Sequence, residues 1–410
     1  MKNLDRGWVL TCFGTAVGAG ILFLPIQAGL SGVWSIVFLT FIIYPITYFS
    51  HRGITRIVAS CPKETDIIGA IEYDLGYTMG LVISILYFLS IISICVGYAT
   101  GLTNIINSFL TNQMYCVRLP RSLLTFVVLI IMTLIMLSSE KIMITITSIV
   151  TFPLIILLFM LSVYMIPKWN FSAFCQPFVI KNFVKNTLLL LPILIFAMNF
   201  SPVCSSLGTF YRKKYNDIDK AIIHSDSIVK WNSLILLFFV MFFVFSLFFS
   251  VTPDILINAK NNNVDILTAI ALAYNNKILK YVSPVIAFLA IISSYFGHFT
   301  GTREGLSGII IQIISWKHPE IKHKLNLKKI KLFSTLLLFV LLWFLAIYNP
   351  SILSIIGALA APVIALYAYL MPVVLMKHIP RLRKYRSKLA FFIFVIGIFT
   401  IVGYYIEKII

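Results

Sequence analysis

The sequence predicts an all-α, polytopic membrane protein that crosses the bilayer with about eleven helices and forms a single domain over residues 1–410. Composition is the first observation behind this prediction: 60% of the residues are hydrophobic and only 11% are charged, whereas about a quarter of a soluble domain is charged. The second is the recurrence of long apolar segments along the whole chain. The third is the distribution of Lys and Arg, which collect in alternate connecting segments.

Each predicted span is a segment of mostly apolar residues, because about 20 such residues cross the hydrocarbon core of a bilayer as a helix. No soluble domain and no low-complexity tract separates these segments. The predicted spans cover residues 7–29, 32–52, 78–109, 121–138, 143–166, 186–207, 231–251, 281–301, 332–348, 351–376 and 388–408.

The basic residues predict the orientation. The formal net charge is +19, which in a soluble protein would suggest nucleic acid, but the cytoplasmic loops of membrane proteins also collect Lys and Arg. With the N-terminus placed inside, 24 of the 33 Lys and Arg residues fall on the inner side and 9 on the outer side. We therefore expect a cytoplasmic N-terminus, a C-terminus outside and no nucleic-acid partner.

Other function classes find little support in the sequence. The six cysteines form no CxxC pair and have no histidines at metal-ligand spacing, so we expect no metal and no cofactor; Cys116 and Cys175 share the outer side, which allows a disulfide. An enzyme would need clustered carboxylates or histidines, but His298 and Glu304 fall on different faces of one helix. The chain shows neither the continuous polar stripe expected of a channel nor the output domain expected of a nutrient sensor.

The first predicted span contains "GTAVGAGILFLP", residues 14–25, in which glycines and a proline weaken the helix near mid-membrane. Glycine costs a helix about 1 kcal/mol relative to alanine and proline about 3 kcal/mol, and unpaired backbone groups in lipid cost several kcal/mol more. Such a break persists where it lines an enclosed cavity, and Pro25 is expected to hold Leu24 away from helical geometry. The alternative is close helix packing through Gly14 and Gly18, which are four residues apart.

A second weakened segment, "LLLLPILIFAMNFSPVCSSLG", lies in the sixth predicted span and favours the cavity interpretation. Pro192 and Pro202 are expected to interrupt it, and Asn199 and Ser201 precede the second proline. The two breaks are five spans apart, so their helices run in opposite directions, as in an inverted repeat. The predicted repeats cover residues approximately 7–167 and 186–376, with 388–408 as an extra helix.

Helix ends exposed inside a membrane have a defined chemistry. Free N–H groups at the start of a half-helix attract an anion such as a carboxylate, and free carbonyl groups at the end of another bind an ammonium group or Na⁺. Together these ends suit a zwitterion, and an α-amino acid is the simplest zwitterionic nutrient.

Four stretches carry a resemblance to a known family: "FGTAVGAGILFLPIQAG", "YPITYFSHRGITRIVAS", "PILIFAMNFSPVCSS" and "SSYFGHFTGTREGLSG". In this order, and over nearly the whole chain, they resemble the hydroxy and aromatic amino acid permeases, above all their serine/threonine branch. These permeases are transporters of the bacterial inner membrane in the amino acid–polyamine–organocation superfamily. The resemblance implies a leucine-transporter-like fold of five plus five inverted helices and an eleventh, with discontinuous helices 1 and 6. It also implies import of serine or threonine by proton symport.

The resemblance also implies where the substrate binds. It places substrate contacts at the two breaks, on Thr15, Ala16, Gly18, Ala19, Gly20, Asn199 and Ser201. Tyr98 in the third span is a further candidate, the alternative being a helix-packing hydroxyl. Family members often carry Asn-His-Ser-Pro where this chain has Phe200 in place of the histidine. Phe200 neither titrates nor donates a hydrogen bond, so any role of that histidine has changed here.

Candidates for ion coupling lie in the eighth span. His298 titrates near neutral pH and is interpreted as a proton relay or a substrate contact, or else as a histidine bonded to a neighbouring helix. Glu304 is a proton carrier or, near the inner boundary, part of a salt bridge or gate. Ser293 and Ser294 are potential oxygen ligands for Na⁺, which leaves sodium coupling as an alternative.

Three further expectations concern packing and partners. Gly297, Gly301 and Gly305 predict a close-packing ridge, while His51 and Arg52 are expected to be interfacial anchors at the end of the second span. The expected partners are a small amino acid and membrane lipids. Tryptophan or tyrosine remains an alternative substrate, and the sequence leaves the oligomeric state open.

Overall fold

The computed structural model describes residues 3–62, 65–115, 119–137, 140–274, 277–317 and 325–406. Within these ranges all regular secondary structure is helical, which confirms the predicted all-α class. The principal helices are α1 (Asn3–Ala16), α2 (Ala19–Ser31), α3 (Val33–Ala59), α4 (Ile67–Ser108), α5 (Arg121–Leu137), α6 (Glu140–Met165), α7 (Ile180–Ala197), α8 (Ser201–Lys214), α9 (Ile218–Ser250), α10 (Pro253–Asn261), α11 (Ile266–Ala273), α12 (Lys277–Lys317), α13 (Leu327–Ile347), α14 (Ile352–Ile355), α15 (Ala361–Ile364), α16 (Met371–His378) and α17 (Ala390–Ile406).

Shorter helical turns join several of these elements. Two π-helical segments, η5 (Ile356–Ala360) and η6 (Ala365–Leu370), link α14, α15 and α16 into one helical stretch over Ile352–His378. A third π-helical segment ends the long helix α4, and 3₁₀ turns follow α6 and α16. These four segments are η1 (Phe109–Gln113), η2 (Ile166–Lys168), η3 (Ser172–Cys175) and η7 (Pro380–Tyr385).

Eight described helices are long and apolar enough to cross a membrane, or nine if α1 and α2, bent by 52°, count as one span. Two more apolar helices, Arg121–Leu137 and Ala390–Gly403, are shorter. Every segment predicted as a span falls on one of these helices or on a broken pair. The count of eleven stays a prediction, because the two short helices fall below the length that alone identifies a span.

The prolines do not break the helices where the sequence suggested. Pro25 lies inside α2 and Leu24 is helical, so the expectation that Pro25 holds Leu24 out of the helix is wrong. Pro192 likewise lies inside α7, while Pro202 stands in the first turn of α8, where its missing N–H costs nothing. The first break occurs instead at Gly18, whose φ of −145° and ψ of −143° leave helical geometry.

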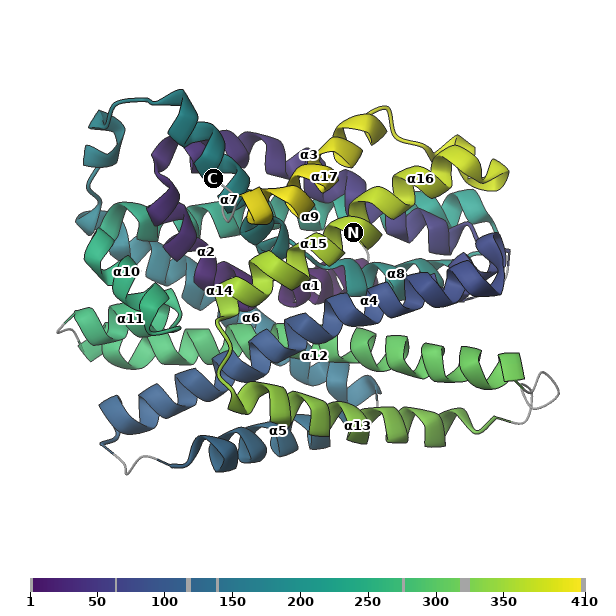
Figure 1. Ribbon diagram of the computed structural model, residues 1–410, viewed down its shortest axis with the longest axis horizontal. Helices are drawn as coiled ribbons and strands as arrows, with labels where there is room; N and C mark the ends of the chain where they lie inside the picture. The colour runs from purple at the N-terminus through teal and green to yellow at the C-terminus, as the bar shows by residue number, and fades with distance from the viewer. Residues whose placement is uncertain are drawn as a thin grey trace.

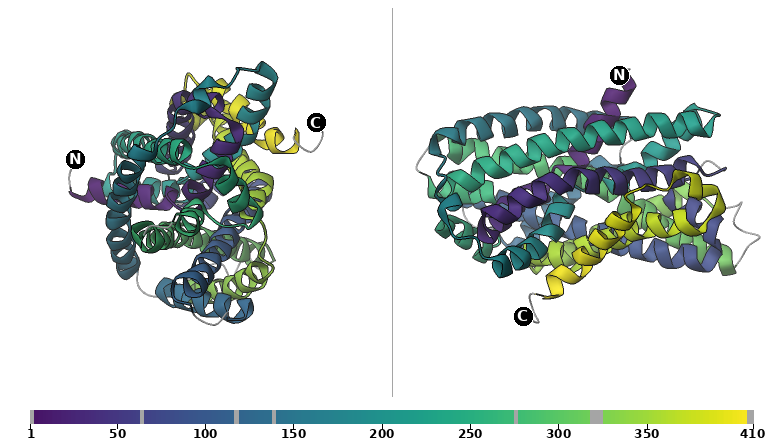
Figure 2. Two further views of the ribbon diagram at one scale, coloured as in Figure 1. Left: turned by 90° about the vertical axis from the view of Figure 1, so that its left-hand side faces the viewer. Right: turned by 90° about the horizontal axis from the view of Figure 1, so that it is seen from above.

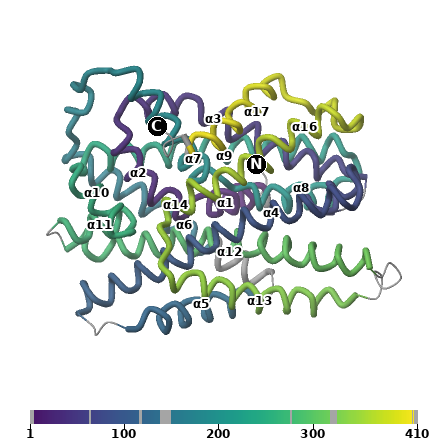
Figure 3. Tube along the Cα trace, in the orientation of Figure 1, coloured from purple at the N-terminus to yellow at the C-terminus, as the bar shows by residue number. Residues whose placement is uncertain are grey.

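The longest helices run the full length of the bundle. At 41 residues, α12 is about 60 Å long, and it continues beyond the predicted span 281–301 to Lys317. A kink at Gly76 divides α4, because its φ of +76° is in the region that favours glycine. In Figures 1 and 3, α4 and α12 pass side by side through the bundle, with α5 and α13 together along one edge.

The broken helices occupy the interior of this bundle. Helix α1 contacts α6, α9 and α12, and α2 contacts α7. Figure 2 shows the N-terminal end of α1 projecting from one side of the bundle, whereas α2 turns into it. The bend between α1 and α2 therefore lies inside the protein, surrounded by helices from both halves of the chain.

Candidate functional site

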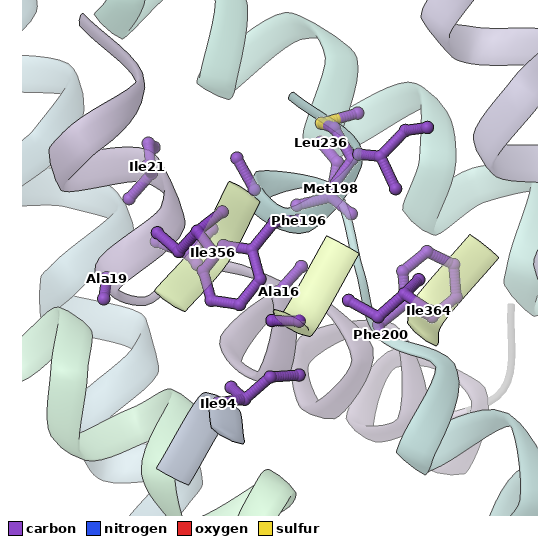
Figure 4. Close-up of a cluster of buried hydrophobic side chains, with 14 of the residues drawn as sticks. Ala16, Ala19, Ile21, Ile94, Phe196, Met198, Phe200, Leu236, Ile356 and Ile364 are labelled. Carbon is purple, nitrogen blue, oxygen red and sulfur yellow. The ribbon is translucent and has the colours of Figure 1, made fainter. Parts of the chain in front are cut away.

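The two helix breaks lie against each other in the middle of the bundle. In the close-up of Figure 4, Ala16 from the first break and Phe196 and Phe200 from the second belong to one cluster. At Gly20 the approach is so close that a Cβ atom would lie 2.6 Å from Ala197 Cα. The structure thus brings together the two breaks that the sequence predicted separately.

One side of the first break presents oxygen atoms to α12. The Ser294 hydroxyl donates to the Thr15 carbonyl oxygen over 2.5 Å, and the Ser293 hydroxyl donates to the Val17 carbonyl oxygen over 3.4 Å. Both serine side chains are buried. Hydroxyl oxygens and freed carbonyl oxygens at a helix end can coordinate a sodium ion or accept hydrogen bonds from an ammonium group.

The other side of the first break presents hydrogen-bond donors. Helix α2 begins at Ala19, and Gly18 at its N-cap has no side chain to accept from the first N–H groups of the helix. The start of a helix carries unpaired N–H groups and the positive end of the helix dipole. Gly18, Ala19 and Gly20, all expected to contact substrate, therefore form a helix start suited to a carboxylate.

The second break, between α7 and α8, places polar side chains in the same region. The Asn199 side-chain oxygen accepts from the Ser201 hydroxyl over 2.6 Å and from the Ser201 N–H over 3.3 Å. The Ser201 hydroxyl also contacts the hydroxyl of Tyr367 on η6. Asn199 is only 1% exposed, and its side-chain nitrogen has no hydrogen-bond partner among the described residues. A buried donor of this kind is available to a bound molecule.

Tyr98 and His298 adjoin the first break. The Ser294 hydroxyl lies 2.7 Å from the Tyr98 hydroxyl oxygen, and the His298 ring stands edge-on to the Tyr98 ring at 5.3 Å between centroids. His298 Nδ1 lies 3.0 Å from the Ser294 carbonyl oxygen in its own helix. A Cβ atom at Gly18 would lie 2.9 Å from the Tyr98 hydroxyl oxygen. These predicted residues share one site.

Glu304 is the predicted residue that the structure leaves apart. It lies ten residues beyond Ser294 on the continuous helix α12, which places it about 15 Å further along the helix axis. Its side chain is half-buried, and the neighbouring Arg303 guanidinium donates to the Met136 carbonyl oxygen on α5 over 3.1 Å. Glu304 is therefore distant from the first break, although Gly301, one turn before it, faces Pro202 of α8.

The glycines of α12 allow that helix to approach both broken helices. A Cβ atom at Gly297 would lie 2.6 Å from Thr15 Oγ1, and one at Gly301 would lie 3.2 Å from the Pro202 ring. The predicted close packing is confirmed at Gly297 and Gly301, which face the helices that carry the breaks, whereas Gly305 makes an ordinary contact with Phe88 of α4.

His51 is the residue that sequence reasoning misplaced. Helix α3 continues to Ala59, so His51 is fully buried and the expectation of an interfacial anchor is wrong for it. Its Nε2 accepts from the Phe200 N–H over 3.0 Å, and its ring stacks on the Phe200 ring at 4.0 Å. Arg52 does lie over the aromatic rings of its own helix, as an anchor would. The sequence did carry a sign of this buried position. Thr47 and Thr55 lie one turn before and one turn after His51, so the three polar side chains share one face of the helix.

Asparagines close one end of the bundle. The Asn104 side chain on α4 donates to the Asn263 carbonyl oxygen and to the Asn349 side-chain oxygen, each over 3.1 Å. Arg121 donates to the Asn104 side-chain oxygen over 2.7 Å and, through two N–H groups, to the Ala346 carbonyl oxygen near the end of α13. Asn263 and Asn349 have positive φ values of 53° and 48°, which asparagine tolerates. This network ties α4, α5 and the connection between α10 and α11 to the start of α14.

The same end carries the short helices α10 and α11. Burial raises the pKa of Asp265, although hydrogen bonds from Leu267 and Thr268 oppose that shift. Cys175 at this end is exposed. Cys116 lies outside the described residues, so its disulfide with Cys175 stays a prediction.

Ion pairs close the opposite end of the bundle. Arg56 on α3 donates to the Asp226 carboxylate on α9 from Nη2 over 2.5 Å and from Nε over 3.0 Å. Arg381, in the turn η7, binds Asp74 on α4 and donates to the Ser60 hydroxyl over 2.8 Å. Each pair joins helices that come from different halves of the chain.

A multi-pass membrane protein with two touching helix breaks at its centre has the arrangement found in secondary transporters. The chain belongs to the tryptophan/tyrosine permease family, whose model matches residues 6–403. The resemblance read from the sequence motifs is thus confirmed.

Relatives and solved structures agree over almost the whole chain. The chain is 34% identical to the serine transporter SdaC of Escherichia coli K12, over 98% of this chain and 94% of that protein. It is 32% identical to the threonine/serine transporter TdcC of Edwardsiella piscicida, over 98% and 95%. Its fold is similar to that of the Eremococcus coleocola manganese transporter, with a TM-score of 0.60, 12% identity, and coverage of 98% and 85%. The complex of MhsT with L-phenylalanine matches with a TM-score of 0.56, 12% identity, and coverage of 98% and 97%.

Proposed function

We propose that this protein is a secondary active transporter that imports serine or threonine across a bacterial inner membrane by proton symport. The observation that carries the proposal is the contact between the two breaks, where the uncapped start of α2 meets the end of α7. Such a site offers donors to a carboxylate and carbonyl oxygens to an ammonium group. The names of the serine and threonine/serine relatives support this substrate class.

The proposed binding mode follows from the chemistry of each group. The substrate carboxylate accepts from the N–H groups of Ala19 and Gly20, while its ammonium group donates to carbonyl oxygens at the end of α7. The substrate side chain faces Tyr98, Asn199 and His298, where a hydroxyl finds both donors and acceptors. We assign His298 to substrate contact, because its Nδ1 is already bonded within α12. Rocking of a helix bundle then exposes the site to either side.

The proposed architecture is the leucine-transporter-like fold. Residues 7–167 and 186–376 form the two inverted repeats, and residues 388–408 form the extra helix. The positions of the breaks support this assignment, because the first lies between α1 and α2 and the second between α7 and α8, five predicted spans later. The excess of Lys and Arg at the end that carries Arg56 and Arg381 supports a cytoplasmic location for that end and for the N-terminus.

Transport by the reconstituted protein tests the proposal. We expect labelled serine or threonine to accumulate in proteoliposomes under an imposed proton gradient, and an uncoupler to abolish that accumulation. Tryptophan and tyrosine, for which the family is named, are the alternative substrates, and we expect both to be taken up more weakly than serine or threonine, as the names of the serine and threonine/serine relatives suggest. Accumulation driven by sodium alone would contradict proton symport, and uptake of none of the four amino acids would contradict the substrate class.

Replacing Ser294 with alanine tests the first break. The substitution removes the partner of both the Thr15 carbonyl and the Tyr98 hydroxyl, and a lost hydrogen bond costs about 1 kcal/mol. We therefore expect Ser294→Ala to raise the KM for serine roughly fivefold to tenfold, with little change in maximal rate. Ser233→Ala is the matched control, because Ser233 is also buried but bonds only within α9. An unchanged KM for Ser294→Ala would remove Ser294 from the site.

A further inference from the structure

The hydrogen bonds of His51 define its protonation state. The Phe200 backbone N–H, 3.0 Å from Nε2, can only donate, so Nε2 is the unprotonated nitrogen. The Thr47 carbonyl oxygen, 2.8 Å from Nδ1, can only accept, so Nδ1 carries the hydrogen. The imidazole is therefore neutral, and it caps the start of α8 from another helix.

A second proton on this ring would change the second break. Protonated Nε2 is a donor and no longer accepts from Phe200, so the Phe200 N–H at the start of α8 becomes free. The ring would then place a positive charge at the positive end of the α8 dipole, which is unfavourable in the absence of an anion. A carboxylate bound at the breaks would accept from the freed N–H and neutralise that charge. Binding of the proton and of a carboxylate therefore favour each other.

A polar connection leads from His51 toward the protein surface. The Ser50 hydroxyl lies 3.0 Å from His51 Nδ1. Ser50 and Tyr369 line a hollow that also includes Arg386 from the connection before α17. One hydroxyl group therefore separates the buried imidazole from this hollow.

The other ionisable side chains near His51 on neighbouring elements are a thiol and a phenol. The Cys204 thiol on α8 contacts the Phe200 carbonyl oxygen at 3.7 Å, and Tyr369 on η6 interacts with Ser50. Both are neutral groups with ordinary pKa values above that of histidine.

The charged residues of the same helix are directed elsewhere. The Arg52 guanidinium lies over aromatic rings of α3, at 4.5 Å and 4.8 Å from their centroids. Arg56 binds Asp226 of α9, one turn further along. Among the described residues that contact the second break, His51 is therefore the one with a free ring nitrogen lone pair that can take up a proton.

We propose that His51 carries the coupled proton, and that its protonation releases the Phe200 N–H as a further donor to the substrate carboxylate, which is held at the start of α2 where the two breaks touch. The inference rests on the proposed amino acid symport and names the coupling residue of that site. The coupling residue is then on α3, whereas the two candidates that the sequence analysis named for the proton, His298 and Glu304, are on α12.

Calorimetry of serine binding tests this assignment. Titrations at several pH values, in buffers with different ionisation enthalpies, measure the protons taken up per serine bound. For the native protein we expect uptake of about one proton and an affinity that rises about tenfold for each unit of falling pH. His51→Gln keeps an oxygen that can accept from Phe200 and should bind serine with no proton uptake and no pH slope. His378→Gln, at an exposed histidine at the end of α16, should behave as the native protein.

Opposite results overturn the inference. Proton uptake retained by folded His51→Gln would show that another group carries the proton. Should His51→Gln fail to fold, His298→Gln decides the question: whatever its serine affinity, it retains proton uptake under our inference, and loss of uptake would assign the proton to His298. Serine binding by the native protein without proton uptake would overturn the role of His51 and leave amino acid transport standing. Absence of any serine or threonine binding would overturn the proposed function and the inference with it.

Discussion

Gly20→Ala should strongly reduce transport while leaving the protein folded and inserted in the membrane. The added Cβ atom would lie 2.6 Å from Ala197 Cα and 2.8 Å from the Phe196 ring. Since one of these atoms is backbone, no side-chain rotation relieves the clash, and α2 must move away from α7. Overpacking of this kind costs about 1–3 kcal/mol, and here the strain falls on the contact between the two breaks. We expect serine uptake to fall by about tenfold or more.

Uptake by proteoliposomes, normalised to reconstituted protein, measures this effect. Gly97→Ala on α4 is the matched control, because Gly97 is also buried and helical but a Cβ atom there would meet no atom within 4 Å. We expect this variant to transport as the native protein does, or to be slightly more stable, since alanine is the better helix former. Normal uptake by Gly20→Ala would contradict the assignment of the site to the touching breaks.

Arg381→Ala should destabilise the protein by about 3–5 kcal/mol, because it leaves a buried carboxylate without its cation. The Asp74 side chain is only 2% exposed, and the Arg381 Nε donates to it over 2.6 Å. The same guanidinium donates to Ser60 at the end of α3. The substitution therefore breaks a link between η7, α3 and α4. Thermal unfolding of the purified protein in detergent measures the loss as a lower Tm.

Two comparison variants make this prediction specific. Lys384→Ala removes the partner of Asp219, but both of those side chains are more than half exposed, so water replaces the pairing and the Tm should hardly change. Arg381→Ala combined with Asp74→Asn should recover part of the lost stability, because the uncompensated charge is then removed. A Tm for Arg381→Ala equal to that of Lys384→Ala would show that the Asp74 pair contributes no more than a surface pair.

Much of the fold and the position of the site could be predicted from the sequence. Apolar segments of membrane length define where helices lie, because lipid leaves backbone groups no partner except each other. Gly18 and the Asn199–Pro202 stretch revealed the two breaks for the same reason. Their separation by five predicted spans indicated that they would meet. The family motifs were readable along the chain, and the family was confirmed.

Other features depend on contacts between distant segments and could not be read from local sequence. Pro25 and Pro192 remain inside helices because neighbouring helices surround them, although a local rule predicts interruption at each. His51 looked like a residue at the end of a span, and only the packing of α3 against α8 shows that it caps the second break. Glu304 is separated from the first break because α12 continues unbroken for ten residues beyond Ser294.

The sequence by itself therefore determined the class of protein, the places where the helices break and the residue types available there. The tertiary structure decided which groups meet: Gly20 with Ala197, Ser294 with Tyr98, and His51 with Phe200. The physical reason is a difference in range. Hydropathy and helix propensity act over a few residues of chain, whereas a hydrogen bond to a freed helix end requires two atoms about 3 Å apart, and their approach depends on how all the helices pack.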